Sequence, residues 1–284
     1  MKVVRKFDPW NNELCTCPEK YSLNPYTGCG HRCIYCYATY IPNFYSPRRK
    51  KNLIERLRKD LDSIPPNSII SISNSSDPYT PMDKEYRDTR KCIQTLSEYD
   101  FSVLIVTKGD LVLRDIDLLQ NLTSAVTITI TTLKEKISQK LEPNAPPPNT
   151  RFEVLKKLSD NNVSNGLRFD PIFPELNEVE IEEVIRKASE VGASYVVSST
   201  FKPQIDSWKR YKAAFPNTAE ATESMYFEEG EKLGNSLYLS TDLRRDILNE
   251  VKQECFKHGL NFATCREGLG IGNSPSCDGS HLCS

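Results

Sequence analysis

Short apolar runs rich in β-branched residues alternate along the chain with longer amphipathic stretches. Between residues 51 and 62, apolar side chains recur at positions 53, 54, 57 and 61, a spacing that predicts a helix, and two prolines at 65 and 66 end the pattern. Further helical patterns cover 84–99, 114–121, 150–162 and 177–191. The apolar runs predict six strands, at 21–24, 68–73, 101–106, 125–131, 163–169 and 193–198.

Strands that alternate with amphipathic helices indicate βαβ units and a mainly parallel sheet. Six such units favour an α/β fold of the partial (β/α)6 TIM-type barrel kind, while a doubly wound sheet is the rival topology that periodicity does not exclude. After about residue 200 the alternation fades, and 203–215 and 241–258 look helical. We therefore predict an N-terminal segment (1–20), a partial barrel (21–215) and a helical, Cys-rich C-terminal extension packed on the barrel (216–284).

The charges of the chain nearly cancel, since 37 Lys and Arg face 38 Asp and Glu for a net charge of −1. This balance argues against a protein that binds nucleic acid by charge alone. No apolar run approaches the ~18 residues of a membrane helix, and the start of the sequence has no apolar signal region. We expect a cytoplasmic protein without a membrane partner. Its ten cysteines then suggest metal or redox chemistry before disulfides.

The strongest chemical signal is a C-x3-C-x2-C spacing formed by Cys29, Cys33 and Cys36. Three thiolates within eight residues can hold a [4Fe–4S] cluster and leave one iron open to bind a cofactor. The alternatives are a zinc site or three buried core thiols. Structural zinc sites usually have four protein ligands, and no fourth Cys or His follows at finger spacing. The sequence therefore favours the cluster, with these three cysteines as its ligands.

With Tyr35 just before the third cysteine, this spacing is the signature of the radical SAM superfamily. Residues 24–38 (NPYTGCGHRCIYCYA) resemble the spore photoproduct lyase-related branch, the DNA repair photolyase-like proteins. The resemblance spans about residues 20–200 and continues through Ser76-Asp77-Pro78-Tyr79-Thr80-Pro81, Thr89-Arg90, Thr107-Lys108-Gly109, Arg114-Asp115 and Leu141-Glu142-Pro143-Asn144-Ala145-Pro146.

This resemblance implies a partial (β/α)6 barrel, a [4Fe–4S] cluster and S-adenosylmethionine (AdoMet). It also implies that AdoMet is cleaved reductively to a 5′-deoxyadenosyl radical, which abstracts hydrogen from a substrate. An external electron donor of the ferredoxin or flavodoxin type would supply the electron.

Most of the predicted strands end in polar residues, and ligands of parallel β/α folds bind at the carboxyl ends of strands. Hydroxyls and amides suit the ribose and methionine moieties of AdoMet, and a lysine suits its carboxylate. In proteins of the resembled family, the segment after the second strand and the Thr-Lys pair lie near the cofactor. The resemblance thus assigns cofactor binding to Tyr35, Ser73, Ser75, Ser76 and Lys108. The alternative for each serine is a turn or a helix cap.

The substrate is less well defined by the sequence, and no catalytic side chain is assigned. Residues 48–59 hold seven basic residues against one acidic residue, which suits a phosphate-bearing substrate or, alternatively, a solvated helix face. The aromatic residues Tyr37, Tyr40, Phe44 and Tyr45 could stack on bases or belong to the core. A nucleic-acid base or lesion is one hypothesis. Modification of RNA, a protein or a small metabolite, and a non-enzymatic iron–sulfur or zinc protein, are the others.

Four further cysteines, Cys255, Cys265, Cys277 and Cys283, fall within the last thirty residues. A loop-rich segment with four thiols would be stabilised by a second iron–sulfur cluster or a zinc ion. Cys15 and Cys17 could contribute ligands if the N-terminal segment crosses the barrel. Scattered buried thiols are the competing interpretation, and disulfides are a third.

Overall fold

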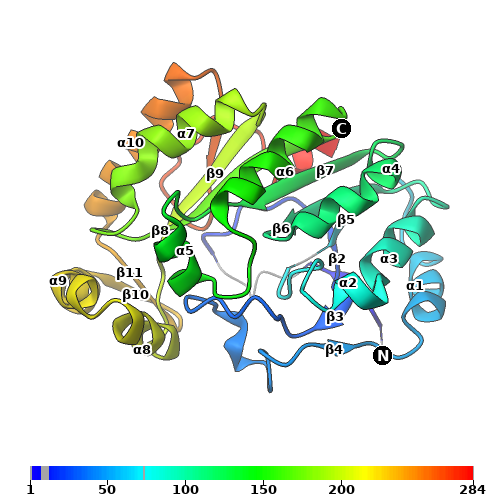
Figure 1. Ribbon diagram of the computed structural model, residues 1–284, viewed down its shortest axis with the longest axis horizontal. Coiled ribbons are helices and arrows are strands. Elements are labelled where there is room, and N and C mark those ends of the chain that lie inside the picture. Colours follow the sequence, from blue (N-terminus) through cyan, green and yellow to red (C-terminus); the bar gives the residue numbers. More distant parts are fainter. Residues whose placement is uncertain (1, 8–12, 73, 284) are drawn as a thin grey trace.

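One eight-stranded sheet organises the computed structural model, which describes residues 2–7, 13–72 and 74–283 (Figure 1). The strand order is β1-β2-β5-β6-β7-β8-β9-β12, and every neighbouring pair is parallel except β1 with β2. The strands are β1 (Val4–Lys6), β2 (Tyr21–Leu23), β5 (Ile69–Ile72), β6 (Ser102–Thr107), β7 (Ser124–Thr129), β8 (Ser164–Ile172), β9 (Tyr195–Thr200) and β12 (Asn261–Thr264).

Helices cover the outer face of this sheet, while two small hairpins and further helices lie at its edges (Figure 1). The helices are α1 (Leu53–Leu61), α2 (Asp83–Tyr86), α3 (Asp88–Leu96), α4 (Ile116–Leu119), α5 (Glu135–Leu141), α6 (Pro148–Asp160), α7 (Ile181–Glu190), α8 (Ile205–Ala214), α9 (Pro216–Phe227) and α10 (Thr241–Lys257). The hairpins pair β3 (Tyr26–Thr27) with β4 (Arg48–Arg49) and β10 (Glu231–Leu233) with β11 (Ser236–Tyr238). Short 3-10 helices are η1 (Ala38–Tyr40), η2 (Asp110–Asp115), η3 (Glu178–Glu180) and η4 (Ser280–Cys283).

The six predicted strands all form, each within a few residues of its predicted position. The predicted α/β class and partial barrel are thereby confirmed. Strands β1 and β12 were not predicted, and they extend the sheet with residues from both flanking segments. The division into three parts stays a prediction.

Successive side chains of the central strands point to opposite faces of the sheet, as the pleat requires. Val103 and Ile105 of β6 pack into the large core beneath the outer helices, whereas Leu104 between them packs with Cys283. The Ser102 hydroxyl donates a hydrogen bond to the Cys283 carbonyl oxygen at 3.1 Å. The C-terminal extension therefore fills the inner face of the barrel.

A glycine is required where this segment crosses β9. Gly279 has a φ of +86°, and a Cβ at this position would lie 2.5 Å from the Tyr195 hydroxyl oxygen. That hydroxyl in turn lies 3.1 Å from Thr127 Oγ1 on β7. The C-terminal extension therefore packs directly against Tyr195 of β9 inside the barrel.

No helix in the described ranges is long and apolar enough to cross a membrane.

Candidate active site at the carboxyl edge of the sheet

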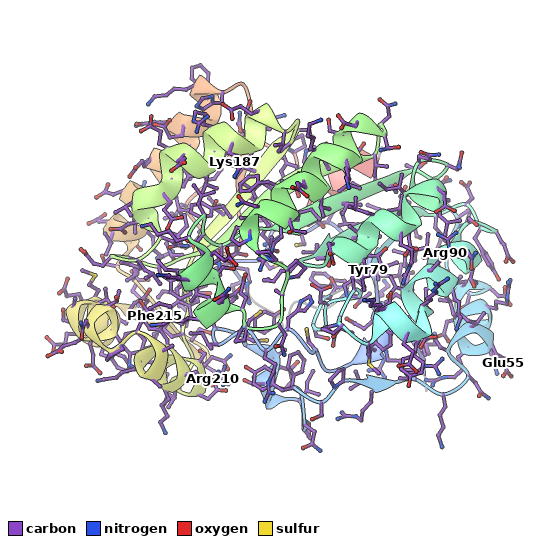
Figure 2. All side chains as sticks on the ribbon, viewed as in Figure 1. Glu55, Tyr79, Arg90, Lys187, Arg210 and Phe215 are labelled. Atoms are coloured by element: carbon purple, nitrogen blue, oxygen red, sulfur yellow. The ribbon has the colours of Figure 1, made fainter. Side chains whose placement is uncertain are left out.

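The cysteine loop leaves the carboxyl end of β2 and is held in shape through its backbone. The Tyr45 hydroxyl donates to the Cys33 carbonyl oxygen at 2.9 Å. From α8, the Arg210 guanidinium donates to the carbonyl oxygens of Ile34 at 2.7 Å and Cys36 at 2.8 Å; Figure 2 labels this arginine. Because these bonds fix carbonyl groups, the thiols stay free to act as ligands.

The three thiols of this loop are well shielded from water. Cys29 and Cys33 are buried and Cys36 is half-buried. Burial raises the pKa of Cys29 to about 12 and raises the pKa values of Cys33 and Cys36 as well. The protons are therefore retained until a metal displaces them. Three soft sulfur donors in one rigid loop fit an iron–sulfur cluster.

A buried carboxylate, Glu142, joins the cysteine loop to the barrel. It accepts hydrogen bonds from the Tyr35 hydroxyl and from Thr131 Oγ1, the latter at 2.5 Å. Arg151 Nη1 lies 2.5 Å from Oε2, and Lys108 Nζ lies 3.9 Å from Oε1. Burial alone would raise the pKa of Glu142, but Arg151, Lys108 and the hydrogen bonds together lower it. Glu142 is therefore ionised and links four structural elements.

Lys108 lies at the carboxyl end of β6, beside the cysteine loop. Its ammonium group is 5.6 Å from the centre of the Tyr35 ring, and its side chain is 16% exposed. Burial would lower its pKa, but the nearby Cys33 and Glu142 raise it. The structure therefore brings together two of the predicted cofactor residues, Tyr35 and Lys108, and Lys108 keeps its positive charge there.

The serines after β5 are tied to the start of the cysteine loop by one side chain, Asn24. Its Oδ1 accepts hydrogen bonds from the backbone N–H groups of Ser75 at 3.3 Å and Ser76 at 3.4 Å. Ser76 is buried and Ser75 is half-buried. Ser73, the remaining predicted serine, lies outside the described residues. The part of this segment that is described therefore lies next to the loop.

Asp77 connects the same segment to β6 and was given no role by sequence reasoning. Its carboxylate accepts hydrogen bonds from Thr107 Oγ1 at 2.6 Å and from the Lys108 N–H at 2.8 Å, and His31 Nδ1 lies 3.3 Å away. Burial opposes ionisation, yet these neighbours lower the pKa of Asp77 to about 2. Asp77 and Glu142 both lie in motifs that carried the family resemblance, which was the one signal that could have found them.

The remaining predicted metal ligands fall into separate places. Cys265 and Cys277 pack in one cluster together with Cys17. Cys255 lies on α10 in the main core, and Cys283 packs on the inner face of β6 and β7. The structure thus brings together two of the four C-terminal cysteines.

Two relatives resemble the chain in sequence over more than half its length. An uncharacterized protein of Methanocaldococcus jannaschii is 32% identical over 166 residues, which cover 57% of this chain and 63% of the relative. An uncharacterized protein of Acidianus two-tailed virus is 29% identical over 199 residues, covering 62% of this chain and 65% of the relative. The chain thus spans less than two thirds of the length of these curated relatives.

Solved structures share the fold at low sequence identity. A variant of spore photoproduct lyase with bound AdoMet and dinucleoside spore photoproduct matches with a TM-score of 0.70 at 16% identity, covering 90% of this chain and 79% of that one. The protein SuiB of Streptococcus suis, bound to S-adenosylmethionine, matches with a TM-score of 0.54 at 16% identity, covering 86% of this chain and 49% of that one.

The family comparison covers the part of the chain that builds the site. Residues 23–188 match the family model of the radical SAM superfamily. This range runs from the end of β2 into α7 and contains the cysteine loop, Lys108 and Glu142. Membership implies a [4Fe–4S] cluster and AdoMet, which the three thiols and their surroundings fit. The chain belongs to the radical SAM superfamily of enzymes.

Proposed function

We propose that the protein is a radical SAM enzyme that removes a hydrogen atom from a base or base lesion of a nucleic acid. When bound, the cluster and AdoMet supply a 5′-deoxyadenosyl radical, once an external donor of the ferredoxin or flavodoxin type has provided an electron. Cys29, Cys33 and Cys36 would hold the cluster. We also propose a reducing, cytoplasmic setting, which suits a chain whose ten cysteines, all within the described ranges, form no disulfide.

The chain itself would bind, orient and shield the reactants. Lys108 would attract the AdoMet carboxylate, because its charge is retained in a site that contains little water. Tyr35 would lie beside AdoMet as the ring neighbour of Lys108. Ser73, Ser75 and Ser76 would contribute from the segment assigned to the cofactor, which Asp77 joins to the Lys108 N–H. Filling of the barrel by the C-terminal extension would keep water from the inner side.

Replacing Lys108 with alanine is expected to weaken AdoMet binding by about 1.5–3 kcal/mol, through the loss of one charge-assisted hydrogen bond. Equilibrium dialysis of the cluster-loaded protein measures this affinity. Lys157→Ala, on the exposed surface of α6, is the matched control and should leave the affinity unchanged. Equal affinities of Lys108→Ala and the parent protein, with the cluster intact, would remove Lys108 from the cofactor site.

The observation that favours a nucleic-acid substrate is an exposed basic and aromatic rim beside the cysteine loop. It is formed by Arg32, Tyr40 and Arg48, and Tyr40 is 61% exposed. The Arg32 guanidinium lies 5.7 Å from the centre of the Tyr45 ring.

The hydrogen bonds of Arg48 go to three backbone carbonyl groups, so they leave its charge available to a phosphate. Exposed aromatic rings offer stacking surfaces for bases. The spore photoproduct lyase structure described above contains a dinucleoside lesion together with AdoMet.

Transfer of deuterium from substrate to 5′-deoxyadenosine tests the proposal directly. Reduced, cluster-loaded protein would be incubated anaerobically with AdoMet and, in separate reactions, with deuterated irradiated DNA, tRNA, or a peptide and metabolite extract. We expect label transfer from one of the two nucleic acids. Transfer from the extract alone would overturn the nucleic-acid assignment. Absence of 5′-deoxyadenosine in every reaction would overturn the proposal that the protein cleaves AdoMet.

Charge reversal of the rim gives an independent result. The double variant Arg32→Glu/Arg48→Glu is expected to lose at least about tenfold in affinity for an oligonucleotide and to show a shallower salt dependence, because two phosphate contacts disappear. Fluorescence anisotropy at two salt concentrations measures both. Lys157→Glu changes the charge on the outer surface of α6 and should leave the affinity near that of the parent protein.

A further inference from the structure

Four cysteines outside the radical SAM loop come together from opposite ends of the chain. The sulfur atoms of Cys17 and Cys277 are 3.6 Å apart although 260 residues separate them. Cys15 lies two residues before Cys17 and interacts with it electrostatically, and Cys265 packs in the same cluster as Cys17 and Cys277. Cys265 also interacts electrostatically with both Cys15 and Cys277. These four cysteines form one cluster of thiols on the inner face of the barrel.

Buried positive charges surround this group of thiols. Lys20 is 5% exposed and forms an ion pair with Asp278, and Arg168 of β8 pairs with Asp170 at 2.8 Å. Both cations interact electrostatically with the Cys17 sulfur. A group of thiolates around a metal carries net negative charge, which these nearby cations would stabilise. The two ion pairs are therefore compatible with metal-bound thiolates at this place.

The loops that carry the cysteines are fixed to the barrel. Glu267, two residues after Cys265, accepts hydrogen bonds from the Thr200 N–H at 2.7 Å and from Lys202 Nζ at 2.6 Å. At Gly268, which has a φ of +70°, a Cβ would lie 2.8 Å from Leu14 Cδ2. This close approach holds the N-terminal segment against the loop after β12. The arrangement of the thiols is therefore supported by contacts beyond their own.

We propose that Cys15, Cys17, Cys265 and Cys277 hold a second, thiolate-ligated metal centre. Four sulfur donors are the closed ligand set of either a [4Fe–4S] cluster or a Zn²⁺ ion. No three His, Cys, Asp or Glu side chains in the described part of the chain are arranged to hold a single metal ion, and this includes the radical SAM cysteines. At both places, side chains would have to close around the metal. Thiol protons released on binding would pass to solvent.

The second centre would lie next to the first. Tyr37 directly follows the cluster ligand Cys36, and Arg266 directly follows Cys265. The Arg266 guanidinium lies 5.5 Å from the centre of the Tyr37 ring, so one cation–π contact joins the two cysteine groups. Cys255 and Cys283 pack elsewhere and are not part of the proposed centre.

Metal and sulfide analysis of anaerobically reconstituted protein tests this proposal. We expect about eight irons in the parent chain if the second centre is a [4Fe–4S] cluster, or about four irons and one zinc if it is a zinc site. The variant Cys17→Ser/Cys277→Ser should lose the additional metal and keep about four irons. Cys255→Ala/Cys283→Ala removes two thiols that pack elsewhere and should match the parent protein. About four irons without zinc in the parent chain would overturn the proposal.

The variant Cys29→Ala/Cys33→Ala/Cys36→Ala tests the second centre in the absence of the radical SAM cluster. It also keeps the test decisive if Cys17→Ser/Cys277→Ser fails to fold. It should retain about four irons or one zinc at the second centre. A folded triple variant that binds neither iron nor zinc would overturn the proposal. Because this measurement requires no AdoMet or substrate, it stands apart from the test of the proposed function.

Discussion

Replacing Cys33 with alanine is expected to abolish both the iron–sulfur absorbance of the radical SAM cluster and all cleavage of AdoMet. Cys33 is buried at the centre of a loop whose carbonyl groups are held by Tyr45 and Arg210. Two remaining thiolates would not hold a four-iron cluster tightly. Absorbance would be compared after reconstitution of a protein that also lacks Cys17 and Cys277, so that any second centre does not contribute. Formation of 5′-deoxyadenosine under reducing conditions measures cleavage.

Cys92→Ala is the matched control for this experiment. Cys92 is a buried thiol on α3 that packs in the main core, away from the cysteine loop. Its replacement should preserve the cluster and AdoMet cleavage. Full cleavage by Cys33→Ala, or loss of the cluster in both variants alike, would contradict the assignment of Cys33 as a ligand.

Replacing Arg151 with methionine is expected to destabilise the protein by about 3–5 kcal/mol, because a carboxylate is left buried without its strongest partner. Arg151 is 1% exposed, and Glu142, its partner, has a fully buried side chain. Arg151 also donates hydrogen bonds to the carbonyl oxygens of Pro146 at 2.7 Å and Thr129 at 3.1 Å. Urea denaturation of wild type and variant at pH 7 measures the change in the free energy of unfolding.

A second substitution separates the ion pair from the packing of Arg151. Glu142→Gln removes the charge that Arg151 neutralises, so the double variant should recover part of the loss, and the coupling energy of the cycle should exceed about 1 kcal/mol. Arg186→Met breaks an exposed pair with Glu190 on α7 and should cost only about 0.5 kcal/mol. Equal effects of Arg151→Met and Arg186→Met would show that Glu142 does not depend on Arg151.

The same pair predicts how stability depends on pH. The pKa of Glu142 is lowered in the folded protein, so its contribution is present above the ordinary glutamate pKa and is lost as the pH falls through the folded value. Without Arg151 that pKa should rise. The acid-induced loss of stability caused by Glu142 begins near the ordinary glutamate pKa in both proteins, so in the variant it would be smaller and would end at a higher pH, within the same denaturation series.

The sequence predicted the parallel strands well because buried strands of such a sheet are continuous apolar runs. The run that became β6, for example, is flanked by clear turn signals and needs no tertiary information. Strand β12 has four residues, of which only Phe262 and Ala263 are buried. So short a segment forms a strand because β9 provides its hydrogen-bonding partner, and this partner is not visible in local sequence.

The site was predictable where spacing carries the chemistry and not where the fold creates it. Cys29, Cys33 and Cys36 are close in sequence, so the ligand set could be identified without a structure. Glu142 is different, because charged residues are rarely buried and the groups that permit its burial come from other elements. The pairing of Cys17 with Cys277 depends on an even longer separation, which no local pattern reports.

The packing of residues 276–283 into the barrel has a consequence for the order of folding. These residues follow every strand of the sheet in the sequence, yet they cover the inner faces of β6, β7 and β9. During synthesis that apolar surface stays uncovered until residues 276–283 have been made, and such surfaces make folding intermediates prone to aggregation. The contact between Cys17 and Cys277 closes a loop of 260 residues, so it can form only after the intervening chain is made. Covering of the barrel interior is therefore expected to follow the synthesis of all eight strands of the sheet.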